Sequence, residues 1–274
     1  MTINCKGKLI DLSSPKVMGI LNITPDSFYD GGKFNDEKDI LEQVGCMLNE
    51  GATFIDVGAY SSRPGANFVS EGDELKRIVP IINLIIKNFP ETLISVDTFR
   101  AEVAKQCIET GAALINDISG GKQYENMLQT VADLQVPYIM MHMRGNPQNM
   151  QQLTDYKNIV NDILFYFSER ITAAKSLGIK DVIVDPGFGF AKTLEQNYKL
   201  LNNLQLFNMI DKPILVGISR KSMIYKLLET TPKNALNGTS ALNTIALQKG
   251  ASILRVHDVK EAIECVKLVK MLSR

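Results

Sequence analysis

The sequence predicts a closed (β/α)₈ barrel, in which eight parallel strands alternate with helices. The first observation is a series of short runs rich in β-branched residues, which are typical of buried strands. The second is helical periodicity between the runs, as at Ile40, Val44 and Met47. The third is length, because a barrel of this kind needs about 250 residues and the chain has 274.

The eight expected strands lie at residues 17–22, 53–57, 93–97, 113–116, 137–142, 182–185, 213–219 and 253–257. Strands separated by helices pair in parallel through right-handed crossovers. Residues 1–12, with a turn around Gly7, precede the first unit and are expected to form a β-hairpin at the bottom of the barrel. We see no linker or low-complexity tract, so we expect one domain over residues 1–274. A doubly wound open sheet is the alternative.

Composition excludes several classes of protein. The chain carries 30 Lys and Arg against 30 Asp and Glu, so it lacks the basic field that nucleic-acid binding requires. Its apolar runs are far shorter than the roughly 18 residues that span a bilayer, and we expect a cytoplasmic protein with no membrane partner. The four cysteines form no CxxC pair and the chain has two histidines, so we expect reduced thiols and no His-rich metal centre.

Alternation along each strand predicts which side chains face the barrel axis. In residues 253–257, Leu254 and Val256 share the outer face, so Arg255 and His257 face inward. The same reasoning turns polar residues inward at the other strand ends, namely Asn22, Asp56, Asp97, Asn116, His142, Asp185 and Ser219. Barrels bind ligands at the C-terminal ends of their strands, so the sequence predicts a binding site there.

A structural alternative exists for some of these residues. Asp97, Asn116 and Ser219 each stand just before an expected helix, where such residues commonly cap free N–H groups. Arg255 and His257 cannot cap a helix N-terminus and need an anionic partner inside a barrel. Arg220 and Lys221 oppose the dipole of the helix that follows them, which favours an electron-rich partner, although both side chains can also extend into water.

The inward groups divide into two chemical sets. Asp97, Asn116 and Asp185 accept hydrogen bonds, which suits the edge of a nitrogen heterocycle with adjacent N–H donors. A second set suits phosphate, with Lys221 at the boundary: Asn22, Arg63, Arg255 and His257. No cysteine or serine is placed as a covalent nucleophile, so we expect catalysis by positioning and by stabilisation of a leaving anion.

Two connections are longer than usual for such a barrel. Residues 23–32 carry two aromatic side chains, and residues 58–66 carry hydroxyl groups and Arg63. Long loops over a barrel mouth commonly act as substrate clamps. The alternative is that these two loops are insertions without a function.

Seven residue strings lie at 18–28, 95–98, 115–117, 141–143, 185–190, 219–222 and 255–258. Together and in this order, they resemble the motifs of bacterial dihydropteroate synthases. The resemblance implies a TIM-barrel homodimer with an N-terminal hairpin. It also implies an enzyme that joins 6-hydroxymethyl-7,8-dihydropterin diphosphate to p-aminobenzoate in folate biosynthesis, releasing diphosphate with the help of Mg²⁺.

The resemblance also implies roles for individual residues. The pterin would be held by Asp97, Asn116, Met140, Asp185 and Lys221. The diphosphate would be held by Asn22, Arg63, Arg255 and His257, with Asn22 also binding the metal. The p-aminobenzoate would be surrounded by Phe28, Ser62, Arg63, Pro64, Phe190, Ser219 and Lys221. Asp97, Lys221 and Arg255 would be the catalytic residues.

One string departs from the family. Where the family commonly has Gly-Gly-Glu-Ser-Thr-Arg-Pro-Gly, residues 58–65 place Tyr60 at the carboxylate position and Ser62 at the threonine position. Two rival functions are kept. One is a pterin-binding methyltransferase, which is built on a similar barrel with the same acidic pocket and passes a methyl group to a cobalamin protein. The other, to which Tyr60 points, is a catalytically silent paralogue that binds pterins and acts through a partner.

Overall fold

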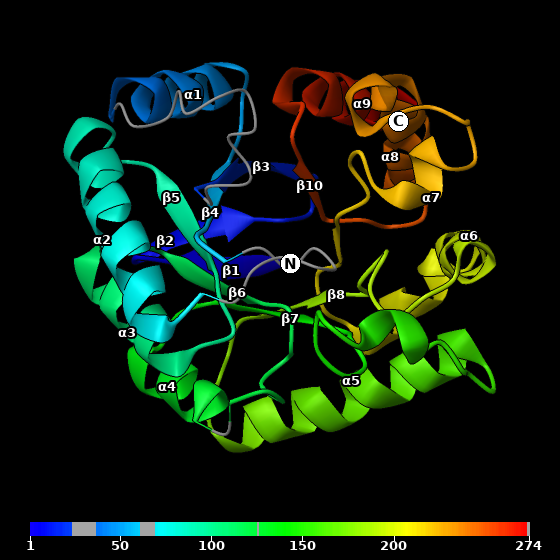
Figure 1. The fold of residues 1–274 in the computed structure, drawn as a ribbon, viewed down its shortest axis with the longest axis horizontal. Coiled ribbons are helices and arrows are strands. Elements are labelled where there is room, and N and C mark those ends of the chain that lie inside the picture. Colours follow the sequence, from blue (N-terminus) through cyan, green and yellow to red (C-terminus); the bar gives the residue numbers. More distant parts are fainter. Residues whose placement is uncertain (24–36, 61–68, 125, 273–274) are drawn as a thin grey trace.

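Eight parallel strands form the centre of the computed structural model, which describes residues 1–23, 37–60, 69–124 and 126–272. Their order is β8-β7-β6-β5-β4-β3-β10-β9. A parallel bridge between Val184 and Ile214 joins the two ends of this order, so the sheet closes into a barrel (Figure 1). The strands are β3 (Lys16–Asn22), β4 (Phe54–Gly58), β5 (Leu93–Asp97), β6 (Leu114–Asp117), β7 (Tyr138–Met141), β8 (Val182–Asp185), β9 (Leu215–Val216) and β10 (Ile253–Val256).

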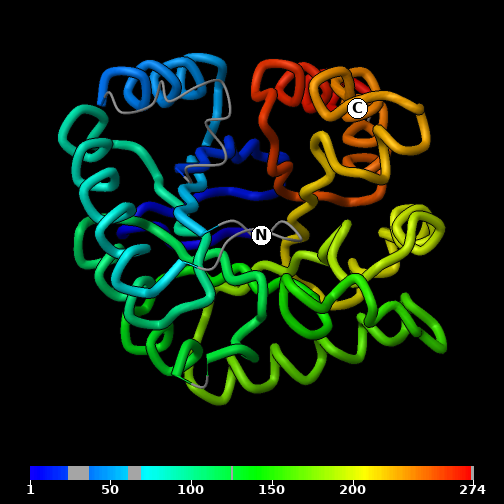
Figure 2. The backbone as a smooth tube through the Cα atoms, viewed as in Figure 1, coloured from blue at the N-terminus to red at the C-terminus, as the bar shows by residue number. Residues whose placement is uncertain are grey.

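Helices surround the strands, as Figure 2 shows. The α-helices are α1 (Glu37–Asn49), α2 (Glu71–Asn88), α3 (Ala101–Thr110), α4 (Met127–Leu134), α5 (Ile159–Ser176), α6 (Leu194–Asn202), α7 (Ser222–Tyr225), α8 (Leu236–Gln248) and α9 (Val259–Leu272). The residues that the structure describes also form the 3₁₀ helices η2 (Met150–Gln152), η3 (Leu204–Ile210) and η4 (Pro232–Asn234). The predicted (β/α)₈ barrel is confirmed.

Local sequence explains where the helices begin. Ser70 caps α2 by accepting a hydrogen bond from the Asp73 N–H. Thr193 and Gln196 form a reciprocal capping box at the start of α6. These caps satisfy backbone N–H groups that have no partner inside the helix.

The N-terminal hairpin pairs β1 (Thr2–Cys5) with β2 (Lys8–Asp11). Its two turn residues, Lys6 and Gly7, have φ angles of 54° and 80°, as a type I′ turn requires. The buried side of the hairpin packs in one apolar cluster with Met18 and Phe54 at the start of β3 and β4. The predicted plug at the bottom of the barrel is therefore confirmed.

A second, larger apolar cluster lies between the strands and the helices. It contains the outward side chains of the strands, for example Val17, Ile94 and Val256, packed against residues such as Val44 and Ile82 of the helices. Outward and inward side chains therefore alternate as predicted along most strands.

The strand predicted over residues 213–219 is shorter than expected, since β9 holds only two residues. Beyond β9 the chain turns, since Arg220 has a left-handed φ of 56° and the Lys221 N–H bonds to the Ile218 carbonyl at 3.1 Å. This turn places Lys221 beside the end of the strand. It therefore forms part of the candidate site.

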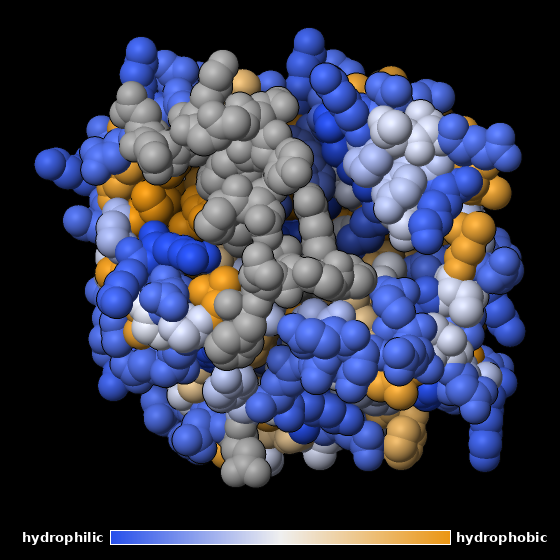
Figure 3. Space-filling model, viewed as in Figure 1, coloured by the Kyte–Doolittle hydropathy of each residue, from blue (hydrophilic) through white to orange (hydrophobic). Residues whose placement is uncertain are grey.

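In the described part of the chain, none of the helices is long and apolar enough to cross a membrane. Figure 3 shows hydrophilic side chains over most of one face of the molecule outside the residues drawn in grey.

Candidate active site

The inward side chains change from apolar to polar along the barrel strands. On β4 the change is from Phe54 to Asp56, and on β10 it is from Ile253 to Arg255. On β5, β6 and β8 it runs from Leu93 to Asp97, from Leu114 to Asn116 and from Ile183 to Asp185. The polar residues therefore gather at the C-terminal end, where barrels of this kind bind their ligands.

Arg255 lies at the centre of this polar group. Its Nε donates to Asp56 Oδ2 at 2.6 Å and its Nη2 donates to Asp97 Oδ2 at 2.7 Å. Asn116 Nδ2 donates to the same Asp56 oxygen at 3.1 Å. Four strands thus bring Arg255, Asp56, Asp97 and Asn116 into one hydrogen-bonded cluster, as the alternation predicted.

Burial and charge act against each other in this cluster. Burial alone would lower the pKa of Arg255, but Asp56 and Asp97 outweigh it and hold that pKa above its ordinary value. Burial raises the pKa of Asp97 to about 7, although Arg255 acts in the opposite direction. Asp56 is fully buried, and its Oδ1 has no hydrogen-bond partner among the described residues. Asp56 Oδ1 can therefore accept a further hydrogen bond, close to the Arg255 guanidinium.

Lys221 and Asp185 form a second group beside the first. Lys221 Nζ donates to the Phe188 carbonyl at 2.5 Å and lies 4.7 Å from the centre of the Phe190 ring. Burial lowers the pKa of Lys221 to about 8, while Asp185 acts to raise it. Burial also raises the pKa of Asp185, against the effect of Lys221. The carboxylate and the ammonium group thus stabilise each other's charged forms.

Two further predicted residues meet after β9 and β10. Ser219 Oγ lies 3.0 Å from His257 Nδ1 and also accepts a hydrogen bond from the His257 N–H at 3.2 Å. Asn22 lies across β4 from Asp97, because a Cβ built on Gly58 would be 3.7 Å from Asn22 Oδ1 and 3.3 Å from Asp97 Cβ. Glycine at position 58 therefore leaves room between the two polar groups.

Two predictions on β7 are wrong, because the alternation there has the opposite phase. Ile139 faces the inside of the barrel, so Met140 packs outward in the layer between strands and helices. His142 also faces outward, with its ring 4.9 Å from that of Tyr166 on α5. The inward side chain is Met141, which packs in a cluster with Phe99 and Ile118. Met140 therefore does not line the same surface as Asp97.

Arg220 has an intramolecular partner. Its Nε and Nη2 donate to the two carboxylate oxygens of Asp258 at 2.9 and 2.5 Å. This bidentate pair accounts for a cation at the start of α7 without any ligand. Of the two adjacent cations, Lys221 is the one that joins the candidate site.

Four predicted residues lie outside the described part of the chain. They are Phe28, Ser62, Arg63 and Pro64.

Sequence reasoning missed a cluster around Tyr60. The Tyr60 ring meets the Phe99 ring edge to face at 5.0 Å, and the Arg100 guanidinium lies 5.4 Å from the Tyr60 ring centre. Arg100 forms a buried ion pair with Glu74 and donates to the Val69 carbonyl at 2.6 Å. The departure of Tyr60 from the family pattern was the only signal of this cluster.

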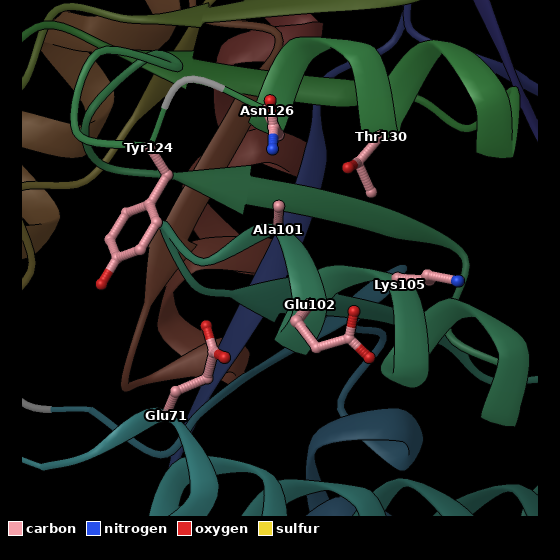
Figure 4. Close-up of a pocket in the computed structure, with 7 residues that line it drawn as sticks. All are labelled: Glu71, Ala101, Glu102, Lys105, Tyr124, Asn126 and Thr130. Atoms are coloured by element: carbon pink, nitrogen blue, oxygen red, sulfur yellow. The ribbon is translucent and has the colours of Figure 1, made fainter.

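A cavity of about 310 Å³ lies outside the barrel, between α2, α3 and α4 (Figure 4). Its lining consists of Glu71, Ala101, Glu102, Lys105, Tyr124, Asn126 and Thr130. None of these is a predicted site residue, so the cavity is separate from the candidate site.

The barrel mouth brings carboxylates and an amide together with a guanidinium and an ammonium group. This combination defines a class of enzyme that binds a polar heterocycle together with an anion. The family described as pterin binding enzyme matches residues 18–257 of the chain. Over 272 residues the chain is 44% identical to dihydropteroate synthase of Escherichia coli, covering 98% of this chain and 96% of that protein. The chain therefore belongs to the dihydropteroate synthase family of pterin-binding enzymes.

Solved structures agree with this assignment. The structure of Yersinia pestis dihydropteroate synthase with a sulfonamide drug complex has a TM-score of 0.94 and 42% identity, covering 100% of this chain and 99% of that one. The Xanthomonas albilineans dihydropteroate synthase in complex with 7,8-dihydropteroate has a TM-score of 0.89 and 33% identity, with coverage of 100% and 99%. The fold and the family are thus shown over the whole length of the chain.

Proposed function

We propose that this barrel mouth joins 6-hydroxymethyl-7,8-dihydropterin diphosphate to p-aminobenzoate, giving 7,8-dihydropteroate and diphosphate for folate biosynthesis. The observation that carries the proposal is the cluster in which Arg255 bonds both Asp56 and Asp97. It provides hydrogen-bond acceptors for a heterocycle next to a cation for a leaving anion. The relatives named above, one of them solved with 7,8-dihydropteroate, support the same reaction.

The acceptor side of the cluster binds the pterin. Asp97, Asn116 and Asp185 lie on β5, β6 and β8, and their oxygens accept hydrogen bonds from the ring N–H and amino groups. Lys221, paired electrostatically with Asp185, donates to an acceptor on the ring. Met141 contributes an apolar contact in place of Met140.

The cationic side stabilises the leaving group. In the reaction the bond between the pterin methylene carbon and a diphosphate oxygen breaks, and the electron pair leaves with diphosphate. The pterin ring delocalises the resulting cation, the amine nitrogen of p-aminobenzoate bonds to the carbon, and that nitrogen then releases a proton. Arg255 and His257, with Arg63, bind the departing anion, and Asp97 lies near the cation. Charges placed in advance where charge develops lower the barrier.

The p-aminobenzoate site adjoins Lys221. Phe190 provides an aromatic wall 4.7 Å from the Lys221 ammonium, and Ser219 lies within the turn from Ile218 to Lys221. Phe28, Ser62, Arg63 and Pro64 complete this site in our proposal. Asp97, Lys221 and Arg255 are the catalytic residues.

We propose Mg²⁺ as the cofactor, with Asn22 as a protein ligand. Asn22 Oδ1 and the Asp97 side chain both lie within 4 Å of a Cβ built on Gly58, and carbonyl and carboxylate oxygens are ligands that suit Mg²⁺. Among the residues that the structure describes, no group of three or more His, Cys, Asp or Glu side chains forms a metal site. Phosphate oxygens and water would therefore supply the other ligands, as is usual for Mg²⁺. The ion would neutralise charge on the diphosphate.

We also propose that residues 1–274 form one domain, that two chains form a homodimer, and that the enzyme works in the cytoplasm. Exposed apolar side chains of α9, namely Leu268, Met271 and Leu272, would be covered in a dimer. The four cysteines are free, which suits a reducing compartment.

The test is a turnover assay with purified protein and Mg²⁺. We expect diphosphate release only when both the pterin diphosphate and p-aminobenzoate are present, with 7,8-dihydropteroate as the second product. Release without the aromatic amine would contradict the synthase. No release with intact pterin binding would favour the silent paralogue, and methyl transfer to a cobalamin protein would favour the methyltransferase.

A further inference from the structure

Lys192 is buried directly beneath the turn that follows β8. The residue is 4% exposed, and its Nζ contacts the Gly187 carbonyl at 2.8 Å, the Phe190 carbonyl at 2.9 Å and His142 Nδ1 at 3.1 Å. An ammonium group has three N–H donors, so the three acceptors match its full hydrogen-bonding capacity.

All three acceptors are neutral groups. Burial lowers the pKa of His142 well below its ordinary value, so the ring is neutral at pH 7. When Lys192 is an ammonium group it donates to Nδ1, which lies 3.1 Å away, and the ring proton is then on Nε2. Burial also lowers the pKa of Lys192, while Asp185 acts to raise it. A charged side chain is rarely buried without a carboxylate in contact, so this lysine needs a reason beyond packing.

The turn held by Lys192 is the one that faces the candidate site. Lys192 binds both of its ends, since Gly187 and Phe190 are also joined by a backbone hydrogen bond of 3.2 Å. From the other side, Lys221 Nζ donates to the Phe188 carbonyl between them. Two lysines therefore bind carbonyls of one turn, Lys192 from the interior and Lys221 from the site.

Other contacts fix the same turn. The Gly187 N–H donates to Asp185 Oδ1 at 2.8 Å, and the Gly189 N–H donates to Asn197 Oδ1 at 2.7 Å. Gly187 has a φ of 71°, and a Cβ at this position would be 2.1 Å from the His142 carbonyl oxygen. The turn is therefore packed closely against the end of β7, and only glycine fits there.

We propose that Lys192 is a positioning residue for the aromatic-amine half of the reaction. By bonding the Gly187 and Phe190 carbonyls, it sets the direction of the Phe190 ring and the place of the Phe188 carbonyl that holds Lys221. It therefore acts on p-aminobenzoate through Phe190 and Lys221. The pterin acceptors Asp97 and Asn116 lie on other strands. Asp185 and Lys221 are joined to the turn by single hydrogen bonds, so we expect a smaller effect on the pterin half. This inference rests on the proposed synthase function.

The central experiment compares Lys192→Met with a matched control, Lys249→Met. Lys249 also donates through Nζ, to the Asn202 carbonyl at 2.8 Å and Gln205 Oε1 at 3.1 Å, but it is only half-buried and these acceptors are not part of the turn. We expect Lys192→Met to raise the KM for p-aminobenzoate about tenfold or more, and the KM for the pterin diphosphate by a clearly smaller factor. Lys249→Met should change neither constant.

A purely structural lysine would give a different pattern. If Lys192→Met lowers the melting temperature and leaves both KM values unchanged, or raises both by the same factor, the positioning role is overturned. Wild-type turnover is measured first. If the wild-type protein makes no 7,8-dihydropteroate, the proposed function fails, whereas normal wild-type turnover with unchanged constants in Lys192→Met refutes only the present inference.

Two further measurements apply if Lys192→Met does not fold. Lys192→Arg keeps donors beneath the turn, and we expect the same selective rise in the KM for p-aminobenzoate, but smaller. The chain has two histidines, so nitrogen NMR of ¹⁵N-histidine resolves the His142 ring in the wild-type protein. We expect an unprotonated Nδ1 between about pH 6 and 8. A protonated Nδ1, or equal changes of both KM values in Lys192→Arg, would overturn the proposal.

Discussion

The two ends of the barrel are built from the same strands but follow opposite rules. At the bottom, Phe54 and Ile253 face inward and pack with the hairpin residues Ile3 and Ile10. Two residues further along the same strands, Asp56 and Arg255 face inward and form an ion pair at 2.6 Å. Because side chains alternate with a period of two along a strand, both the apolar pair and the charged pair face inward. Their position along the barrel axis decides which pair contributes to stability and which to binding.

The energetics of the two ends differ accordingly. Burying a large apolar side chain such as Phe54 contributes about 1.5–3 kcal/mol, and its neighbours tolerate other apolar residues of similar volume. Buried charges cost free energy unless they are paired, and removing one partner leaves the other uncompensated. The polar end therefore depends on particular residues, whereas the apolar end depends on volume.

The largest effect is expected from Arg255→Ala. Turnover should fall by about 10³-fold or more, because the cation that stabilises the leaving anion is lost. The loss also leaves Asp56, with a fully buried side chain, and Asp97 without their partner. The expected loss of stability is about 2–3 kcal/mol, below the usual range for a buried pair because Arg255 is 18% exposed.

Steady-state kinetics and calorimetry with a pterin that lacks phosphates measure the two effects of Arg255→Ala. We expect turnover to fall far more than affinity for that pterin. Equal losses in both would show that Arg255 has only a structural role.

The next largest effect is expected from Asp97→Asn, and it depends on pH. The pKa of Asp97 is raised to about 7, so lowering the pH through this value protonates an acceptor that the pterin needs. Wild-type affinity for the pterin should therefore fall below about pH 7. At pH 8, Asp97→Asn should weaken binding by about 1–3 kcal/mol, since an amide donor replaces half of the acceptor.

Calorimetric titration between pH 6 and 8 measures this dependence. Asp97→Asn should bind the pterin with a flatter pH profile than the wild-type protein, and the exposed Asp133→Asn should behave as the wild-type protein does. An unchanged affinity or an unchanged profile in Asp97→Asn would remove Asp97 from the pterin site.

The smallest effect on activity is expected at the bottom of the barrel. Phe54→Ala should reduce the free energy of unfolding by about 3–5 kcal/mol, through lost transfer free energy and a cavity. Chemical denaturation measures this loss. Both KM values should change by less than about twofold in the folded protein, and a larger change would show that the two ends are coupled.

Alternation made much of the site predictable. Arg255 lies between Leu254 and Val256, and Asp97 follows Val96 and Ile94, so the inner and outer faces differ in polarity. On β7 both faces are apolar, because Ile139, Met140 and Met141 follow one another. The phase could therefore not be determined from the sequence, and the inward placement of His142 by alternation failed. The Met140 prediction, which came from the resemblance, failed on the same strand.

Contacts between distant residues could not be predicted by the same reasoning. Arg220 and Asp258 are 38 positions apart, and Lys192 and His142 are 50 positions apart. Their pairing depends on how turns after different strands fold back on the barrel, which no local pattern encodes. Lys192 was missed for this reason, although it lies two residues beyond a string that the family shares.

The N-terminal hairpin has a consequence for the order of events in catalysis. Because Ile3, Cys5 and Ile10 fill the far end of the barrel, reactants and products all travel through one entrance. A product that lingers there obstructs the arrival of the next substrate. Two strands of four residues each, at the opposite end of the barrel from the candidate site, thus require the product to leave before the next substrate can enter.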